Sequence, residues 1–139
     1  MRRLDVGIGI LALVGLGIAA YLTYIHYAGI KPLCLASGGC EKVQSSPWSR
    51  LVGVPVAVLG LVGYAAILAL LFIPGETGLA ATSLVALIGF GFSLYLTWAE
   101  LFRIHAICQW CVASAVLMTL LAAMSVIRLL AAEEPRAYA

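Results

Sequence analysis

Long apolar runs, separated by short polar segments, dominate the sequence. Four windows carry no Lys, Arg, Asp or Glu except near an end, at residues 6–27, 51–73, 79–102 and 104–130. About 20 apolar residues in a helix cross a hydrocarbon core that is about 30 Å thick. The pattern therefore predicts an all-α integral membrane protein in which four transmembrane helices form a bundle.

The composition supports this interpretation. Hydrophobic residues make up 64% of the chain and charged residues 10%, and the mean hydropathy is +1.11. Soluble domains are about half apolar and about a quarter charged. We predict a single membrane domain over residues 1–139, surrounded by lipid. The formal charge of +2 is small and dispersed, which argues against a nucleic-acid partner.

The polar loop at residues 30–50 is the connection long enough to hold structure of its own. It carries Cys34 and Cys40, with Ser37, Gly38 and Gly39 as a flexible hinge between them. A structural disulfide is one interpretation, but closing so short a ring contributes about 2 kcal/mol at most. A four-helix bundle hardly needs that contribution, so we favour a redox-active dithiol.

A second pair, Cys108 and Cys111, lies at the start of the fourth predicted span. Positions i and i+3 share a helix face, so the two sulfurs can form a disulfide. Backbone N–H groups and the helix dipole favour thiolates in the first turns. The alternative is two small residues packed in an apolar core. Val112 follows the pair where covalent haem attachment needs His.

Two dithiols in one chain can exchange a disulfide and so pass electrons in pairs. Four thiolates can also bind zinc, but the spacing between Cys34 and Cys40 is longer than zinc sites usually show. We therefore predict no metal. Glu100 lies beside Arg103 and near His105. An interfacial salt bridge is the simplest interpretation of these residues, and a proton route to a redox site is the alternative.

Several motifs together resemble those of bacterial and archaeal members of the vitamin K epoxide reductase family. They are the tyrosines that end the first span, Cys34 with C-E-K-V-Q-S-S at 40–46, G-V-P at 53–55, G-L-V-G-Y at 60–64, S-L-Y-L-T at 93–97 with Glu100, and I-C-Q-W-C at 107–111. The resemblance covers nearly the whole chain. It implies a four-helix bundle around a quinone, either ubiquinone or menaquinone.

The resemblance also implies roles for the four cysteines. Cys111 would be the thiol nearest the quinone, with Cys108 as its disulfide partner. Cys34 and Cys40 would accept electrons from a thioredoxin-like (DsbA-like) protein. We expect that partner to be a separate protein, because the chain carries no fused thioredoxin domain.

Ser46 matches the family serine that hydrogen-bonds a quinone oxygen. At Val56 and Ala115 some relatives carry Asn and Tyr, and the loss of these polar contacts argues against epoxide reduction. Trp110, between the two cysteines, is able to line a flat apolar pocket. We therefore expect the quinone to contact Ser46, Trp110, Val56 and Ala115.

Basic residues do not decide the orientation in the membrane. The side with both termini carries Arg2, Arg3, Arg128 and Arg136, and the opposite side carries Lys31, Lys42, Arg50 and Arg103. The resemblance implies cytoplasmic termini in the plasma membrane and an active site that faces the periplasm or the exterior.

The expected function is that of an enzyme, a thiol:quinone oxidoreductase that generates disulfides. Three alternatives stay open. The first is reduction of vitamin K epoxide or of its quinone. The second is a non-enzymatic four-span protein with a structural loop disulfide, and the third is a metal-binding or transport protein that uses the thiolates.

Overall fold

The computed structural model describes residues 2–29, 50–51, 54–105 and 109–137. This part of the chain is almost entirely helical. Its elements are α1 (Arg2–Ala28), β1 (Arg50–Leu51), β2 (Val54–Pro55), α3 (Val56–Leu70), α4 (Gly75–Ala99), the π-helix η2 (Glu100–Ile104) and α5 (Gln109–Ala137).

Among the described residues, three stretches of helix are long and apolar enough to cross a membrane: Arg3–Ala28, Gly75–Arg103 and Gln109–Ala132. They fall on the first, third and fourth predicted spans, so the prediction of a helical membrane protein is confirmed. α3 is equally apolar but has 15 residues. At about 1.5 Å per residue it is about 22 Å long, shorter than a hydrocarbon core of about 30 Å. The fourth span therefore stays a prediction.

The helix in the second predicted span begins five residues later than the apolar pattern indicates. β1 and β2 form a short antiparallel pair, in which Arg50 lies opposite Pro55 and Leu51 opposite Val54. Pro55 has the extended angles φ −59° and ψ 138° and comes directly before the first helical residue. Proline is compatible with this place because the first N–H groups of a helix have no intrahelical acceptor.

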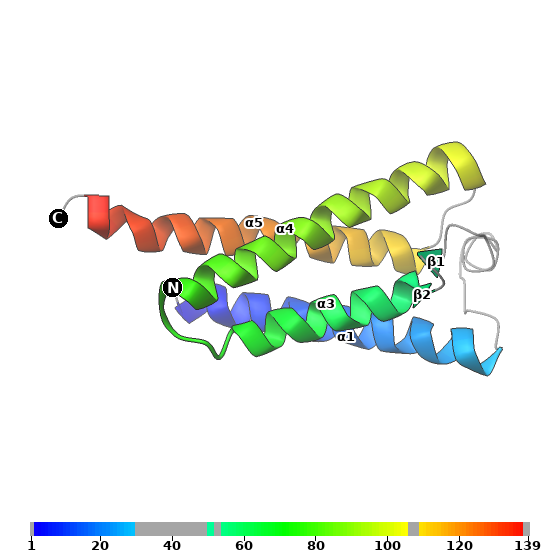
Figure 1. The fold of residues 1–139 in the computed structure, drawn as a ribbon, viewed down its shortest axis with the longest axis horizontal. Helices are drawn as coiled ribbons and strands as arrows, with labels where there is room; N and C mark the ends of the chain where they lie inside the picture. Colours follow the sequence, from blue (N-terminus) through cyan, green and yellow to red (C-terminus); the bar gives the residue numbers. More distant parts are fainter. Residues whose placement is uncertain (1, 30–49, 52–53, 106–108, 138–139) are drawn as a thin grey trace.

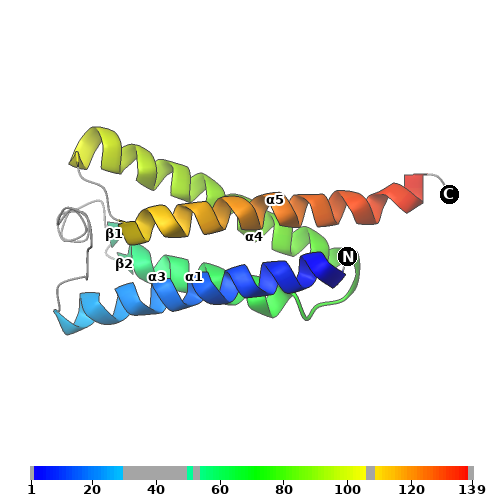
Figure 2. The same cartoon turned by 180° about the vertical axis from the view of Figure 1, so that it is seen from behind.

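The helices lie side by side along the longest axis of the molecule (Figure 1). α1 packs against α3 and α5, and α4 packs against α5 and α3. The two ends of the described chain lie toward one end of the bundle, while β1 and β2 lie at the other (Figures 1 and 2). We call these the terminal end and the hairpin end. α4 crosses α5 obliquely and diverges from α3 toward the hairpin end.

The core contains small and aliphatic residues together with one tyrosine. Its buried members are Ile8, Ala12, Ala19, Tyr64, Ile67, Ala86, Met118, Leu121 and Ala122. Large apolar side chains also cover the outside, and Leu13, Ile88 and Phe72 are 58%, 64% and 86% exposed. In water such a surface would be strongly unfavourable, so this exterior fits a lipid environment.

Candidate functional site

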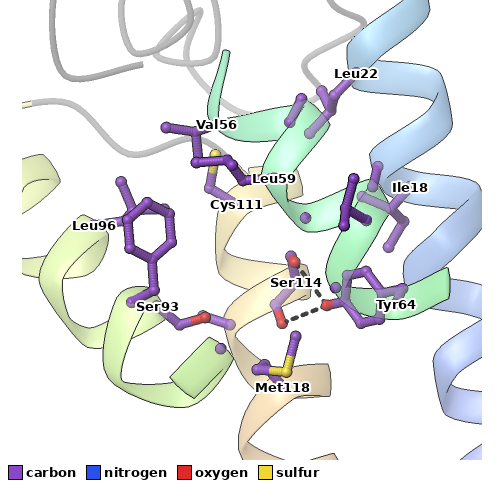
Figure 3. Close-up of a pocket in the computed structure, with 18 of the residues that line it drawn as sticks. Ile18, Leu22, Val56, Leu59, Tyr64, Ser93, Leu96, Cys111, Ser114 and Met118 are labelled. Atoms are coloured by element: carbon purple, nitrogen blue, oxygen red, sulfur yellow. Dashed lines mark hydrogen bonds between the residues drawn. The ribbon is translucent and has the colours of Figure 1, made fainter. Parts of the chain in front are cut away.

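A cavity of about 510 Å³ lies among α1, α3, α4 and α5, and it reaches the first turns of α3 and α5 at the hairpin end. α1 contributes Ile18, Ala19 and Leu22; α3 contributes Val56, Ala57, Leu59, Gly60, Val62, Gly63, Tyr64 and Ala66; α4 contributes Val85, Ile88, Gly89, Phe92, Ser93, Leu96 and Thr97; and α5 contributes Cys111, Ser114, Ala115 and Met118. Figure 3 shows that most of this lining is hydrocarbon. The cavity has the size and polarity of a site for an apolar small molecule.

Cys111 lies in the first turn of α5 and is half-buried in the cavity wall. Val56 and Leu59 of α3 line the same cavity (Figure 3). Backbone N–H groups at the start of a helix favour negative charge, so this position suits a thiolate. An apolar molecule in the cavity would therefore share the cavity with the Cys111 sulfur.

Two further predicted residues, Val56 and Ala115, line the same cavity. Both thus share a cavity with Cys111, and their contact with a quinone stays a prediction. Neither side chain offers a hydrogen bond, so these two positions shape the cavity by volume alone.

Trp110 is placed differently. Its ring packs against Tyr21 of α1, with ring centroids 5.2 Å apart and an interplanar angle of 53°. It is not among the residues that line the cavity. Consecutive residues on a helix are rotated by about 100° about its axis. The side chains of Trp110 and Cys111 therefore point in different directions. The Trp110 ring thus packs the start of α5 against α1. Its contact with a quinone stays a prediction.

Cys34, Cys40, Ser46 and Cys108 lie outside the described residues. Their pairing and their distances from Cys111 stay predictions. The zinc alternative depends on the same cysteines and stays open with them.

Glu100 is buried, with 5% of its surface exposed, and it lines the cavity. It begins η2, the π-helical turn that ends at Ile104 and is followed by His105 in a left-handed conformation (φ 56°). Turns of this kind occur often at functional sites. The guanidinium of Arg103 lies over the Trp98 ring, 5.8 Å from its centroid. The geometry thus brings a carboxyl group into the wall of the cavity that holds Cys111.

A pair of hydroxyl groups that sequence reasoning did not select lies deeper in the cavity. The Oη atom of Tyr64 lies 2.8 Å from Oγ of Ser114 and donates to the Ser114 carbonyl oxygen at 3.1 Å (Figure 3). Tyr64 is fully buried, and its ring packs where Gly15 of α1 has no side chain. Two signals were available: a tyrosine inside an apolar window, and a serine three residues after Cys111 on the same helix face.

A comparison with protein families agrees with the arrangement described above. The sequence model of the Vitamin K epoxide reductase family matches residues 6–126. The match includes α3, α4, Cys111 and every residue that lines the cavity. Members of this family are membrane oxidoreductases that use quinones as electron acceptors. With most of its length matched, the chain belongs to the vitamin K epoxide reductase family.

Proposed function

We propose that this protein is a membrane thiol:quinone oxidoreductase that generates disulfides in proteins outside the cytoplasm. One observation carries the proposal: the Cys111 thiol lies in the wall of an apolar cavity of about 510 Å³. Ligand sites of about 300–1,000 Å³ with few polar groups suit apolar molecules. A quinone with a hydrocarbon tail is such a molecule, and it is the acceptor that the family uses.

The proposed electron path has three disulfide exchanges or oxidations in series. The dithiol of a thioredoxin-like protein reduces a Cys34–Cys40 disulfide and leaves as a disulfide. The Cys34–Cys40 dithiol then reduces a Cys108–Cys111 disulfide in the same way. Finally, the Cys108–Cys111 dithiol returns to the disulfide as the quinone, ubiquinone or menaquinone, takes up two electrons and two protons to become quinol.

This sequence conserves electrons and protons. One partner dithiol and one quinone give one partner disulfide and one quinol. Each exchange is reversible, so the difference in reduction potentials sets the direction, with about 30 mV equal to about 1.4 kcal/mol for two electrons. Glu100 lines the cavity, and we propose it as a candidate source of the protons that the acceptor takes up.

The apolar side chains of Val56 and Ala115 support a quinone over an epoxide as substrate. Some relatives carry Asn and Tyr at these two positions, and those polar contacts are tied to the epoxide-reducing members of the family. We therefore place epoxide reduction second.

The arrangement of the bundle also supports a proposed orientation. Cys111 lies in the first turn of α5, at the hairpin end, and both ends of the described chain lie toward the opposite one. We propose that the terminal end faces the cytoplasm of a plasma membrane and the hairpin end faces the periplasm or exterior. Disulfides persist on that oxidising side.

The test is anaerobic. The purified protein is fully reduced, one equivalent of a short-chain quinone is added, and alkylatable thiols are counted by mass while quinol is followed by absorbance. We expect thiols to disappear in pairs with equal quinol formed, and Cys111→Ser to form none. Val112→Ser is the matched control, because it places a serine on the exposed neighbouring position of the same helix.

Four thiols that persist with excess quinone would refute the oxidase proposal. Quinol formed at the wild-type rate by Cys111→Ser would instead remove Cys111 from the path. In the first case the structural-disulfide and metal-binding alternatives would return to the front.

A further inference from the structure

Tyr64 and Ser114 put two hydroxyl groups where the cavity is otherwise mostly hydrocarbon. They come from different helices, α3 and α5, and both line the cavity. Ser114 follows Cys111 by three residues, so it lies on the same face of α5 and about 4.5 Å further along the axis. A flat ring that touches the Cys111 sulfur would therefore have one edge beside this pair.

The two hydroxyls do not use all of their hydrogen-bonding groups on each other, and the groups left over can be counted. Each hydroxyl has one hydrogen to donate and lone pairs to accept. Where Tyr64 donates to Oγ of Ser114, the Ser114 hydrogen is left for another acceptor. Where Ser114 donates to Oη of Tyr64, the Tyr64 hydrogen goes to the Ser114 carbonyl at 3.1 Å, and the pair is left to accept.

The pair thus has one arrangement that donates and another that accepts, with only hydroxyl rotation between them. A quinone carbonyl accepts a hydrogen bond, and the hydroxyl of the quinol donates one. A group that can only donate would fit the quinone oxygen, but it could not accept the hydrogen that the quinol hydroxyl has gained. This pair fits both.

We propose that the Tyr64 and Ser114 hydroxyls form the polar contact for one oxygen of the bound ring, donating to the quinone and accepting from the quinol. The inference rests on the proposed function, because it assigns the contact within that same cavity. It also accounts for the apolar residues at 56 and 115, since this pair supplies a polar contact that those positions lack.

A competing interpretation is that the pair only links α3 to α5. Interhelical hydrogen bonds of this kind stabilise membrane proteins by a modest amount. If the pair only links the helices, the affinities for quinone and quinol need not depend on the two hydroxyls. If the pair contacts the bound ring, both affinities must depend on them. The two interpretations therefore differ in what a ligand measurement shows.

The experiment uses Tyr64→Phe, Ser114→Ala and the double variant in the full chain. Turnover is measured with dithiothreitol as the electron donor and a short-chain benzoquinone as the acceptor, with its quinol as product inhibitor. Loss of one neutral hydrogen bond predicts a rise of about three- to tenfold in both the quinone KM and the quinol inhibition constant, with kcat little changed. The double variant should be no worse than the more affected single variant, because the hydroxyls act as a unit.

Two controls remove hydroxyls of the same kind from outside the cavity. Thr119→Ala removes an exposed hydroxyl on α5 that donates to the Ala115 carbonyl at 2.8 Å. Tyr95→Phe removes a tyrosine hydroxyl from the exposed face of α4. Both should leave the quinone KM and the quinol inhibition constant at the wild-type values.

Direct binding separates this inference from the function on which it rests. Quinone binding is measured by quenching of tryptophan fluorescence in Cys111→Ser, with and without Tyr64→Phe. Weaker binding with Tyr64→Phe supports the pair even if the wild-type protein fails to reduce quinone. Unchanged binding together with a lower melting temperature would overturn the inference and leave a helix–helix link.

Discussion

The two ends of the bundle are built from the same four helices but differ in how those helices meet. At the terminal end, Nε of Arg128 on α5 lies 2.9 Å from Oδ1 of Asp5 on α1. Beside it, Oγ of Ser83 on α4 donates to the Ser125 carbonyl of α5 at 3.0 Å. At the hairpin end α4 diverges, and the space between the helices is the cavity (Figures 1 and 3).

The difference shows how a membrane protein keeps a cavity without collapsing around it. Lipid tails are as apolar as the helix surfaces, so hydrophobic burial does not drive the helices together. Packing and polar contacts hold the helices together at the terminal end. Because the helices are stiff, the angles at which they meet there also set their separation at the hairpin end. We therefore expect substitutions at the hairpin end to change activity and substitutions at the terminal end to change stability.

Among substitutions that test the difference between the two ends, the largest effect on activity should come from filling the cavity. Ala115→Trp places a large ring between α3 and α5 in the space that we assign to the quinone. We expect the quinone kcat/KM to fall by about 100-fold, equal to about 2.7 kcal/mol, in a turnover assay with dithiothreitol. Val112→Trp adds the same ring on the exposed face and should have no such effect. Equal losses in both variants would contradict a cavity-specific block.

A smaller effect, on stability alone, should follow from breaking the ion pair at the terminal end. Arg128 is 7% exposed and Asp5 is 48% exposed at their side chains. Asp5→Asn leaves a buried guanidinium with a weaker partner, and because the Asp5 side is half-exposed we expect a loss of about 1–3 kcal/mol in the free energy of unfolding. Unfolding in mixed micelles measures this loss, and the quinone KM should stay within about twofold of wild type.

The control for the ion pair is the double variant Asp5→Asn with Arg128→Met, which removes the buried charge as well. It should recover part of the lost stability. A double variant less stable than Asp5→Asn would show that Arg128 contributes through other contacts.

The smallest effect should come from Ser83→Ala. The change removes the hydroxyl that donates to the Ser125 carbonyl, and hydrogen bonds between membrane helices contribute about 0.6 kcal/mol on average. Thr119→Ala, whose hydroxyl bonds within its own helix, is the matched control for unfolding. A change in quinone KM with Ser83→Ala would contradict the separation of the two ends.

Sequence patterns predicted what depends on neighbours along the chain and missed what depends on helix rotation and long-range contact. The apolar windows located α1, α4 and α5, because twenty or so apolar residues have few other uses. They missed the start of α3, because the pairing of Arg50 with Pro55 is a contact that apolar content does not encode. The family resemblance selected Cys111 and Ala115, and both line the cavity, while their contact with a quinone stays a prediction.

The Tyr64–Ser114 contact was not predicted because it joins residues 50 positions apart. It exists only when α3 and α5 have a particular rotation about their axes. The direction of the Trp110 side chain was not predicted for the same reason. Its place between two cysteines does not determine which way it points, and its ring packs against Tyr21.

Gly15 has a consequence for how this sequence can change over generations. A Cβ atom at that position would overlap the ring of Tyr64, so the two positions are matched in size across two helices. In relatives with a similar bundle, a larger residue at position 15 should accompany a smaller one at position 64. Substitutions at the two sites should then be correlated, and an alignment of many family members would show them as a covarying pair.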